Sequence, residues 1–167
     1  MIIIEGIDGT GKTTLAEELT KLGYEKYHLS YEEKSEEGYL RILQKDTHSL
    51  VLDRSFISEL VYGPILRNFS RINCKQTKNI ISQYQKATTR IIYLKSSKES
   101  LQERRKKDAE DIEMINKYYE ALDSRYDRVI KIMRQYYPVI EIDTSKHNME
   151  AVMKMLESFI QENGERE

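Results

Sequence analysis

The sequence predicts an α/β domain built on a mostly parallel sheet, and two observations support this prediction. Five short strand-type runs alternate with stretches that are long enough to form helices. The first run, residues 1–5 (MIIIE), is apolar along nearly its whole length, which is typical of a strand buried on both faces. The 167 residues are the usual size of one domain with a single core. We therefore expect one sheet covered by helices on both faces and no second domain.

The five strands are expected at 1–5, 25–30, 49–53, 90–95 and 139–143. Helices are expected between and after them, at 13–22, 56–69, 80–86, 98–137 and 149–160. The pair Gly63-Pro64 is expected to bend or split the second helix, because proline removes a helical hydrogen bond. The long fourth helix is expected to break near Asp108 and to stop before Pro138.

Two stripes at helical spacing are expected to pack into the core rather than to bind a ligand. One consists of Ile115, Tyr119, Leu122 and Tyr126, and the other of Met149, Val152, Met153, Leu156 and Ile160. Methionine is a flexible apolar side chain that fills irregular gaps in cores, so the methionines need no functional explanation.

Composition excludes several classes of protein. Lys and Arg total 27 against 28 Asp and Glu, and this balance argues against a dedicated nucleic-acid binder. The single cysteine, Cys74, excludes an internal disulfide and the usual cysteine-rich zinc sites. No apolar run is long enough to span a bilayer, and the N-terminus lacks the features of a signal peptide. A cytoplasmic protein without membrane contact is expected.

Residues 6–13 (GIDGTGKT) follow the first strand directly and fit the phosphate-binding pattern G-x-x-x-x-G-K-[ST]. Glycines let the backbone wrap around phosphate oxygens, and the amides at the following helix N-terminus point at the anion. Lys12 is expected on the β- and γ-phosphates and Thr13 on Mg²⁺, so ATP and Mg²⁺ are the expected cofactors. The residues expected to bind the nucleotide are Gly6, Asp8, Gly9, Thr10, Gly11, Lys12, Thr13 and Thr14.

The third strand ends in Asp53-Arg54-Ser55, an acid followed by a base. Arginine binds an oxyanion bidentately, so Arg54 suits a second phosphate group beside the nucleotide. Asp53 is expected to organise the water shell of the metal ion or to orient Arg54. The alternative interpretation of this pair is a plain salt bridge at the end of the strand.

Two segments carry a resemblance to a known family. Residues 5–14 (EGIDGTGKTT) resemble the phosphate loop of thymidylate kinases, E-G-x-D-G-x-G-K-T-T, and residues 53–62 are similar to their D-R-x-x-x-S-x-x-x-Y motif. Deoxynucleoside kinases are a related family, but the acidic Asp8 favours the monophosphate kinases. The resemblance implies the P-loop nucleotide kinase fold, with a five-stranded parallel sheet in the order 2-3-1-4-5 and helices on both faces.

The resemblance implies a single kinase domain that spans residues 1–167. It also implies roles for individual residues of that domain. Asp8 corresponds to the aspartate that faces the sugar hydroxyl of the acceptor, and Arg54 to the arginine that holds its phosphate. The remaining candidates for acceptor binding are Glu5, Ser58 and Tyr62. Related kinases often form homodimers through helices beside the third strand, and the exposed part of 56–69 is the expected interface for such a dimer.

A lid is expected near 97–112, where the sequence is rich in arginine and lysine. Kinases of this group bring an arginine over the transferring phosphoryl group, and those without one in the phosphate loop carry it in the lid. Arg104 and Arg105 are the candidates, and adjacent residues on one helix cannot share a face. A solvated charge run is the alternative, since Asp108 stands at i+4 from Arg104 and offers it a salt bridge.

The base of the acceptor is not set by the resemblance. Thymidylate kinases normally carry a proline-containing motif after the second strand, and none follows it here. Tyr39 and Arg41 are candidates for a reduced base clamp.

The leading hypothesis is a kinase that phosphorylates a deoxynucleoside monophosphate, with a pyrimidine base favoured. A deoxynucleoside kinase would instead need a carboxylate base, either Glu5 or Asp53. A kinase acting on a hydroxymethylated base or a polynucleotide end, and a regulatory protein that binds ATP without transfer, are further alternatives.

Overall fold

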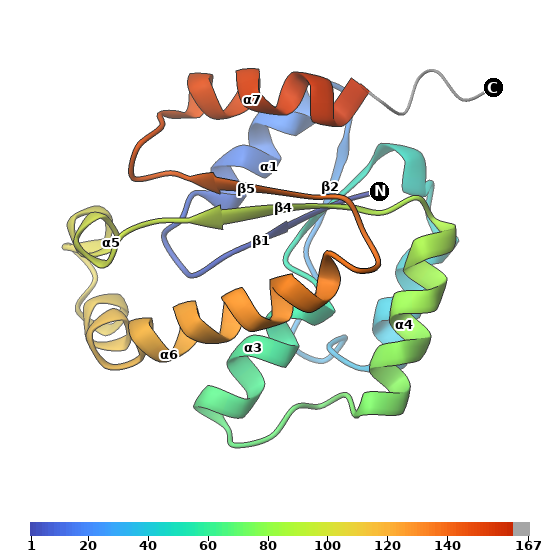
Figure 1. Ribbon diagram of the computed structural model, residues 1–167, viewed down its shortest axis with the longest axis horizontal. Helices are drawn as coiled ribbons and strands as arrows, with labels where there is room; N and C mark the ends of the chain where they lie inside the picture. Colours follow the sequence, from blue (N-terminus) through green and yellow to red (C-terminus); the bar gives the residue numbers. More distant parts are fainter. Residues whose placement is uncertain (162–167) are drawn as a thin grey trace.

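The computed structural model describes residues 1–161, and its five strands form one fully parallel sheet (Figure 1). The strand order is β2-β3-β1-β4-β5. The strands are β1 (Ile2–Glu5), β2 (Glu25–Tyr27), β3 (Leu50–Asp53), β4 (Arg90–Lys95) and β5 (Val139–Asp143). The order expected from the resemblance, 2-3-1-4-5, is confirmed. The single domain predicted for 1–167 includes residues 162–167, which lie outside the described part of the chain.

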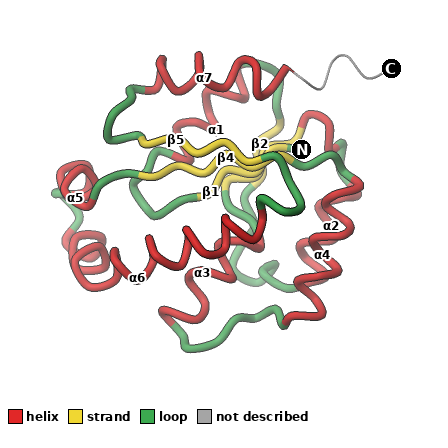
Figure 2. The backbone as a smooth tube through the Cα atoms, in the orientation of Figure 1, coloured by secondary structure: helices red, strands yellow, loops and turns green. Residues whose placement is uncertain are grey.

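Helices cover both faces of the sheet, as predicted (Figure 2). They are α1 (Lys12–Lys21), α2 (Glu36–Arg41), α3 (Phe56–Leu66), α4 (Cys74–Lys86), α5 (Lys98–Arg105), α6 (Ala109–Met133) and α7 (Met149–Gln161), with two short 3₁₀ turns at Ile42–Gln44 and Thr47–Ser49. α1 and α7 pack on one face of the sheet, and α3, α4 and α6 on the other. None of the helices described is long and apolar enough to cross a membrane.

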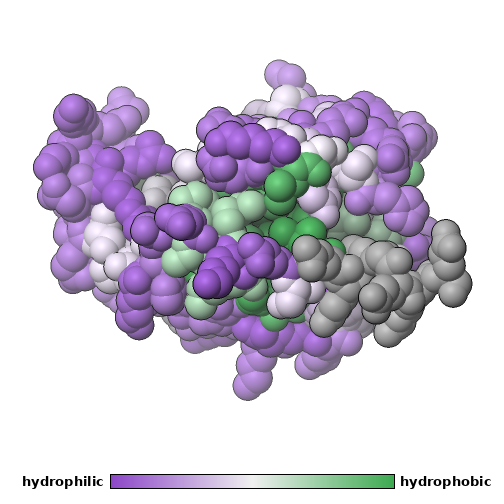
Figure 3. Space-filling view, turned by 90° about the horizontal axis from the view of Figure 1, so that it is seen from above, coloured by the Kyte–Doolittle hydropathy of each residue, from purple (hydrophilic) through white to green (hydrophobic). Residues whose placement is uncertain are grey.

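The alternation of side chains along β1 explains why its first three residues, Ile2, Ile3 and Ile4, are all apolar. Ile3 faces the core formed with α3, α4 and α6, whereas Ile2 and Ile4 face the core formed with α1 and α7. β1 lies between β3 and β4, and its isoleucines meet a hydrophobic core on each face of the sheet. Seen from above, the outer surface over α7 is largely hydrophilic, with hydrophobic side chains confined to a limited patch (Figure 3).

The prediction that Gly63-Pro64 would bend or split a helix is wrong as to splitting, because α3 continues through both residues to Leu66. Pro64 has no N–H to donate to the carbonyl of Leu60 one turn earlier. That carbonyl instead accepts a hydrogen bond of 3.0 Å from Arg125 Nε on α6. A side chain 65 residues away in sequence thus replaces the missing helical bond.

The long helical run breaks near Asp108, as predicted. Asp108 is the N-cap of α6, and its side chain accepts hydrogen bonds of 3.1 Å from the backbone N–H groups of Glu110 and Asp111. The helix α2 was not predicted; Ser35 caps it by accepting a bond of 3.2 Å from the N–H of Gly38. β2 is also shorter than expected and ends at Tyr27.

Candidate active site

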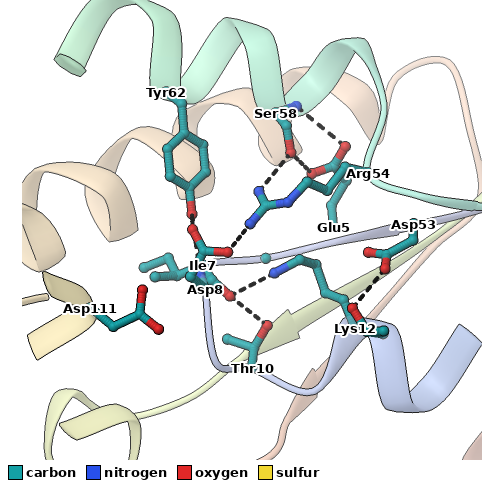
Figure 4. A network of polar contacts seen from close by, with 12 residues as sticks. Glu5, Ile7, Asp8, Thr10, Lys12, Asp53, Arg54, Ser58, Tyr62 and Asp111 are labelled. Carbon is teal, nitrogen blue, oxygen red and sulfur yellow. Dashed lines mark hydrogen bonds and ion pairs between the residues drawn. The ribbon is translucent and has the colours of Figure 1, made fainter. Parts of the chain in front are cut away.

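The loop between β1 and α1 encloses the side chain of Lys12. A Cβ atom at Gly6 would collide with the carbonyl of Leu94, so the chain passes β4 at a distance that only glycine permits. Lys12 Nζ and Thr10 Oγ1 each donate a hydrogen bond of 2.8 Å to the carbonyl of Ile7 (Figure 4). Lys12 is only 5% exposed, and its ammonium group therefore sits inside the loop.

Burial and the nearby Arg54 guanidinium lower the pKa of Lys12 to about 7. Asp8, Glu5 and Asp53 oppose this shift but do not cancel it. Because burying this positive charge costs free energy, a bound anion that neutralises it would stabilise the loop. The loop is therefore arranged to receive phosphate oxygens at Lys12.

Thr13 and Asp53 form an all-oxygen pair at the end of β3. Thr13 Oγ1 donates a hydrogen bond of 2.7 Å to Asp53 Oδ2, and Asp53 is 5% exposed. Mg²⁺ prefers oxygen ligands and usually takes one or two from the protein, the rest coming from water and phosphates. In the described residues no group of three or more His, Cys, Asp or Glu side chains could hold a metal ion by itself. The pair fits a magnesium ion that is shared with a bound nucleotide.

Arg54 adopts an unusual backbone conformation that turns it toward the phosphate loop. Its φ angle is 75°, in the left-handed region that non-glycine residues rarely occupy, and its N–H donates to the carbonyl of Ile4 at 3.0 Å. Strained residues of this kind are held in place by their surroundings and cluster at functional sites. The guanidinium forms an ion pair with Asp8, not the salt bridge with Asp53 that was the alternative interpretation.

Asp8, Arg54, Ser58 and Tyr62 lie together, as Figure 4 shows. The Tyr62 hydroxyl donates to Asp8 Oδ2 at 3.0 Å, and Arg54 Nη1 donates to Ser58 Oγ at 3.2 Å. Burial alone would raise the pKa of Asp8, but the charges of Arg54 and Lys12 and the bonds from Tyr62 and Arg54 hold it below its usual value. Four predicted residues therefore form one connected polar cluster.

Glu5 lies behind this cluster and is fully buried. Its carboxylate accepts hydrogen bonds from Ser55 Oγ at 2.7 Å, from Ser58 Oγ at 2.6 Å and from the backbone N–H groups of both serines. The hydroxyl of Tyr126 on α6 lies 3.1 Å from Glu5 Oε2 and 3.1 Å from the carbonyl of Gly6. Tyr126 packs in the core, as predicted for its stripe. Its hydroxyl also holds the phosphate loop in place, and helical spacing alone did not indicate this contact.

Two cavities adjoin at this cluster. The larger, of about 550 Å³, is lined by all the residues from Asp8 to Thr14, and we call it the loop cavity. The smaller, of about 300 Å³, is lined by residues of α3 and of the segment after β2, and we call it the α3 cavity. Asp8, His28 and Arg54 belong to both linings. Any group passing from one cavity to the other would meet these three side chains.

Arg104 and Arg105 of α5 both line the loop cavity but have different partners. Arg104 donates to the carbonyl of Gly9 at 3.1 Å and to Thr144 Oγ1 at 3.0 Å, and also to the carbonyl of Thr144. The salt bridge to Asp108 that was the alternative for Arg104 does not form; Asp108 caps α6 instead. Arg105 packs over Gly9 and pairs with Asp111 at 3.0 Å.

Several residues of the two cavities were missed by sequence reasoning. His28 follows β2, and its Nδ1 lies 2.8 Å from the carbonyl of Asp53. Thr144 follows β5. The ends of parallel strands meet at one edge of the sheet, so their position after strands was the available signal. Of the two candidates for a base clamp, Tyr39 lines the α3 cavity and stays a prediction. Arg41 is exposed, pairs with Glu37 and lies outside the cavity, so the prediction for Arg41 is wrong.

Three solved structures are similar to the chain over nearly its whole length. The YorR protein of Bacillus subtilis, in complex with phosphorylated GDP, matches with a TM-score of 0.82 and 24% identity over 99% of each chain. Deoxyadenosine kinase from M. mycoides with bound dCTP matches with a TM-score of 0.65 and 20% identity, over 97% of this chain and 100% of that one. Thymidylate kinase from Candida albicans matches with a TM-score of 0.63 and 17% identity, over 97% and 91%.

Neither models of protein families nor the curated protein sequences give a match to this chain. The structural matches and the strand order nevertheless agree with the phosphate loop and with the lysine that it encloses. The chain has the fold of the P-loop nucleotide kinases.

Proposed function

We propose that this protein is a kinase that transfers the γ-phosphoryl group of ATP to the phosphate of a deoxynucleoside monophosphate, with Mg²⁺. The observation that carries the proposal is the pair of adjoining cavities that share Asp8, His28 and Arg54. A phosphoryl donor in one cavity and an acceptor in the other would meet at these side chains, which is the arrangement that an in-line transfer needs.

The loop cavity is the site proposed for ATP. Backbone N–H groups at the start of α1 and the ammonium group of Lys12 would bind the β- and γ-phosphates. Thr13 and Asp53 would hold Mg²⁺, which neutralises charge on the phosphates when it is bound. Arg105 or Arg104 would cover the transferring group from the lid predicted near 97–112.

The α3 cavity is the site proposed for the acceptor. Arg54 would hold the acceptor phosphate at the boundary of the two cavities, and Asp8 would face the sugar hydroxyl. Binding of a phosphate there would compete with Asp8 for the guanidinium of Arg54, to which both anions are attracted. Ser58 and Tyr62 keep Arg54 and Asp8 in position through the hydrogen bonds described above.

The two carboxylates considered as a base, Glu5 and Asp53, favour a phosphate acceptor over a nucleoside hydroxyl. A hydroxyl acceptor must lose a proton to a carboxylate within hydrogen-bond reach. Glu5 is fully buried and engaged by Ser55, Ser58 and Tyr126, and Asp53 is engaged by Thr13. A phosphate acceptor is already ionised and needs no such base, so the monophosphate is the better fit.

The ligands of similar structures support a nucleotide in such a fold: phosphorylated GDP in YorR, and dCTP or dATP in deoxyadenosine kinase from M. mycoides. Under this proposal the protein acts in nucleotide biosynthesis in the cytoplasm, where ATP and deoxynucleotides are available. The homodimer predicted through the α3 region stays part of the proposal; Leu66 and Phe69 are its exposed apolar side chains.

The proposal is tested by measuring ADP release from ATP and Mg²⁺ with each deoxynucleoside monophosphate and each nucleoside. Turnover with a monophosphate and none with nucleosides is expected. Arg54→Ala is expected to abolish transfer to the acceptor while ATP binding, measured by calorimetry, persists. Bound ATP without turnover on any acceptor would instead favour a regulatory nucleotide-binding protein.

A further inference from the structure

The lining of the α3 cavity carries more lysines and arginines than carboxylates. Its carboxylates are Asp8 and Glu59, and its lysines and arginines are Lys34, Arg54, Arg67 and Arg71. Each carboxylate already has a partner, since Asp8 pairs with Arg54 and Glu59 pairs with Arg67. Among the residues that the structure describes, neither Lys34 nor Arg71 forms an ion pair. Two positive charges of this lining are therefore not neutralised by residues 1–161.

Arg71 is held in place by three contacts. Its guanidinium lies over the ring of Tyr31, 3.6 Å from the ring centroid, and Nη1 donates a hydrogen bond of 3.2 Å to the carbonyl of Tyr31. Its backbone N–H donates to Glu59 Oε1 at 2.8 Å. A guanidinium has five N–H donors, and within the described residues Arg71 uses only the one on Tyr31. A bound anion would meet the other donors at a small cost in side-chain entropy, because the group is already ordered.

Lys34 is connected to Arg71 through the same carbonyl group. The backbone N–H of Lys34 donates to the carbonyl of Tyr31 at 3.4 Å, and that oxygen is the one that Arg71 Nη1 binds. Burial lowers the pKa of Lys34, and the positive charges of Arg54 and Arg71 lower it further. An anion bound beside Lys34 and Arg71 would reduce this repulsion.

The two acidic residues next to Lys34 in the chain do not take the place of such an anion. Neither Glu32 nor Glu33 lines the α3 cavity. Glu33 instead accepts hydrogen bonds of 2.9 Å from the hydroxyl of Tyr27 and from the backbone N–H of Ser30. The side of the turn that faces the cavity is therefore positively charged.

The two linings indicate which part of an acceptor would reach Lys34 and Arg71. Asp8 and Arg54 line both cavities, whereas Lys34 and Arg71 line only the α3 cavity, so they belong to the part away from the boundary. Under the proposed function, Arg54 holds the acceptor phosphate and Asp8 faces the sugar hydroxyl. A second phosphate on that hydroxyl would be repelled by the carboxylate of Asp8. The base extends beyond the sugar, and an acidic group on the base avoids this repulsion.

We infer that Lys34 and Arg71 form a second anion-binding site, and that the acceptor is a deoxynucleoside monophosphate whose base carries an acidic substituent. This inference rests on the proposed function, because it assigns the α3 cavity to the acceptor. The common bases are uncharged at neutral pH and would leave both cations without an anion. A carboxylate suits the pair, since its two oxygens can accept from the guanidinium of Arg71 and from the ammonium group of Lys34.

The experiment compares kcat/KM for 5-carboxy-dCMP with that for 5-hydroxymethyl-dCMP in wild type, Lys34→Gln and Arg71→Gln. The two substituents are similar in size, and only the carboxylate is charged. We expect wild type to prefer 5-carboxy-dCMP by about tenfold or more, as a hydrogen bond to a charged group allows. Each variant should lower this preference by about fivefold or more. Deoxycytidine 3′,5′-bisphosphate is compared with dCMP in the same way, which tests for an anion on the sugar.

Two exposed residues outside both cavities provide matched controls. Lys75→Gln and Arg128→Gln remove the same charges from the surface of α4 and α6, and they should change the preference by less than about twofold. Equilibrium binding of the same monophosphates is measured alongside, so that selectivity is obtained without turnover. Thermal unfolding of each variant shows whether it remains folded.

The outcomes separate this inference from the proposed function. Equal kcat/KM for 5-carboxy-dCMP and 5-hydroxymethyl-dCMP in wild type, or an unchanged preference in Lys34→Gln and Arg71→Gln, contradicts the second anion site and leaves the kinase in place. A preference for the 3′,5′-bisphosphate without one for 5-carboxy-dCMP overturns the assignment of the anion to the base. Selective binding of 5-carboxy-dCMP without turnover supports the anion site and contradicts the kinase. Absence of both binding and turnover with every monophosphate overturns both proposals.

Discussion

Thr13 Oγ1 and Asp53 Oδ2 lie 2.7 Å apart, so the first turn of α1 is joined to the end of β3 by a hydrogen bond between two potential metal ligands. The two residues are 40 positions apart in sequence, and the parallel pairing of β1 with β3 brings them together. An ion that replaced the proton of this bond would find two oxygen ligands already placed. The relationship makes Asp53 the most direct test of the proposed magnesium site.

Asp53→Asn keeps the shape of the side chain but removes its charge. We expect kcat to fall by about 100-fold, because the metal ion would lose its charged protein ligand. The Mg²⁺ concentration needed for half-maximal activity should rise as well. Steady-state kinetics over a series of Mg²⁺ concentrations measures both quantities. Asp46→Asn, at an exposed turn before β3, is the control. Unchanged Mg²⁺ dependence in Asp53→Asn would remove this residue from the metal site.

The two lid arginines are expected to differ in function because their guanidinium groups have different partners. Arg104 is held by the carbonyl of Gly9 and by Thr144, so Arg104→Gln should mainly raise KM for ATP. Among residues 1–161, Arg105 has one ion-pair partner, Asp111, and this pair is partly exposed, so its guanidinium could turn toward a phosphoryl group. Arg105→Gln should lower kcat by about 100-fold or more, as loss of an arginine at the transferring group does in related chemistry. Initial-rate kinetics with varied ATP separates the two effects, and the reverse pattern would exchange the two assignments.

The hydroxyl of Tyr126 is expected to stabilise the fold as well as the site. Tyr126→Phe removes a buried group that lies near Glu5, Gly6 and Ser58 and leaves the Glu5 carboxylate with fewer donors. The free energy of unfolding should fall by about 1–3 kcal/mol. Urea denaturation measures this change, and Tyr136→Phe, at a surface tyrosine, is the control. Equal stability of Tyr126→Phe and wild type would show that the hydroxyl contributes no net free energy.

The fold and the phosphate loop could be predicted from the sequence because their signals are local. Residues 6–13 form one contiguous pattern, and β4 and β5 have the bounds expected from their apolar runs. Strand order came from the resemblance rather than from periodicity. The resemblance assigned both Asp8 and Arg54 to the acceptor, but it did not predict the ion pair between these two residues, which are 46 positions apart.

The remaining features depend on contacts between distant parts of the chain. The bend or split was expected at Gly63-Pro64, and the split does not occur, since α3 continues to Leu66. Arg125 donates to the carbonyl of Leu60, and no local rule indicates that partner. Glu59 and Arg67 are two helical turns apart, and their pairing depends on the missing side chain at Gly63. Tyr126 belongs to an apolar stripe, and the helical spacing of that stripe correctly predicted that its side chain is buried. The same spacing gave no indication of a role for its hydroxyl.

The lowered pKa of Lys12 predicts that ATP binding takes up a proton. With a pKa of about 7, Lys12 has lost most of its charge at pH 8 in the free protein, and bound phosphates would restore it. The affinity for ATP should therefore fall as pH rises above about 7, by at most about tenfold per pH unit, and Lys12 should contribute nothing to pH dependence well below 7. Calorimetry at pH 8 in two buffers of different ionisation enthalpy should detect uptake of about one proton, and at pH 6 almost none from this group. His28→Gln and His147→Gln control for the two histidines that line the same cavity. Proton uptake that is absent at pH 8 in wild type and in both variants would show that Lys12 is already charged before ATP binds.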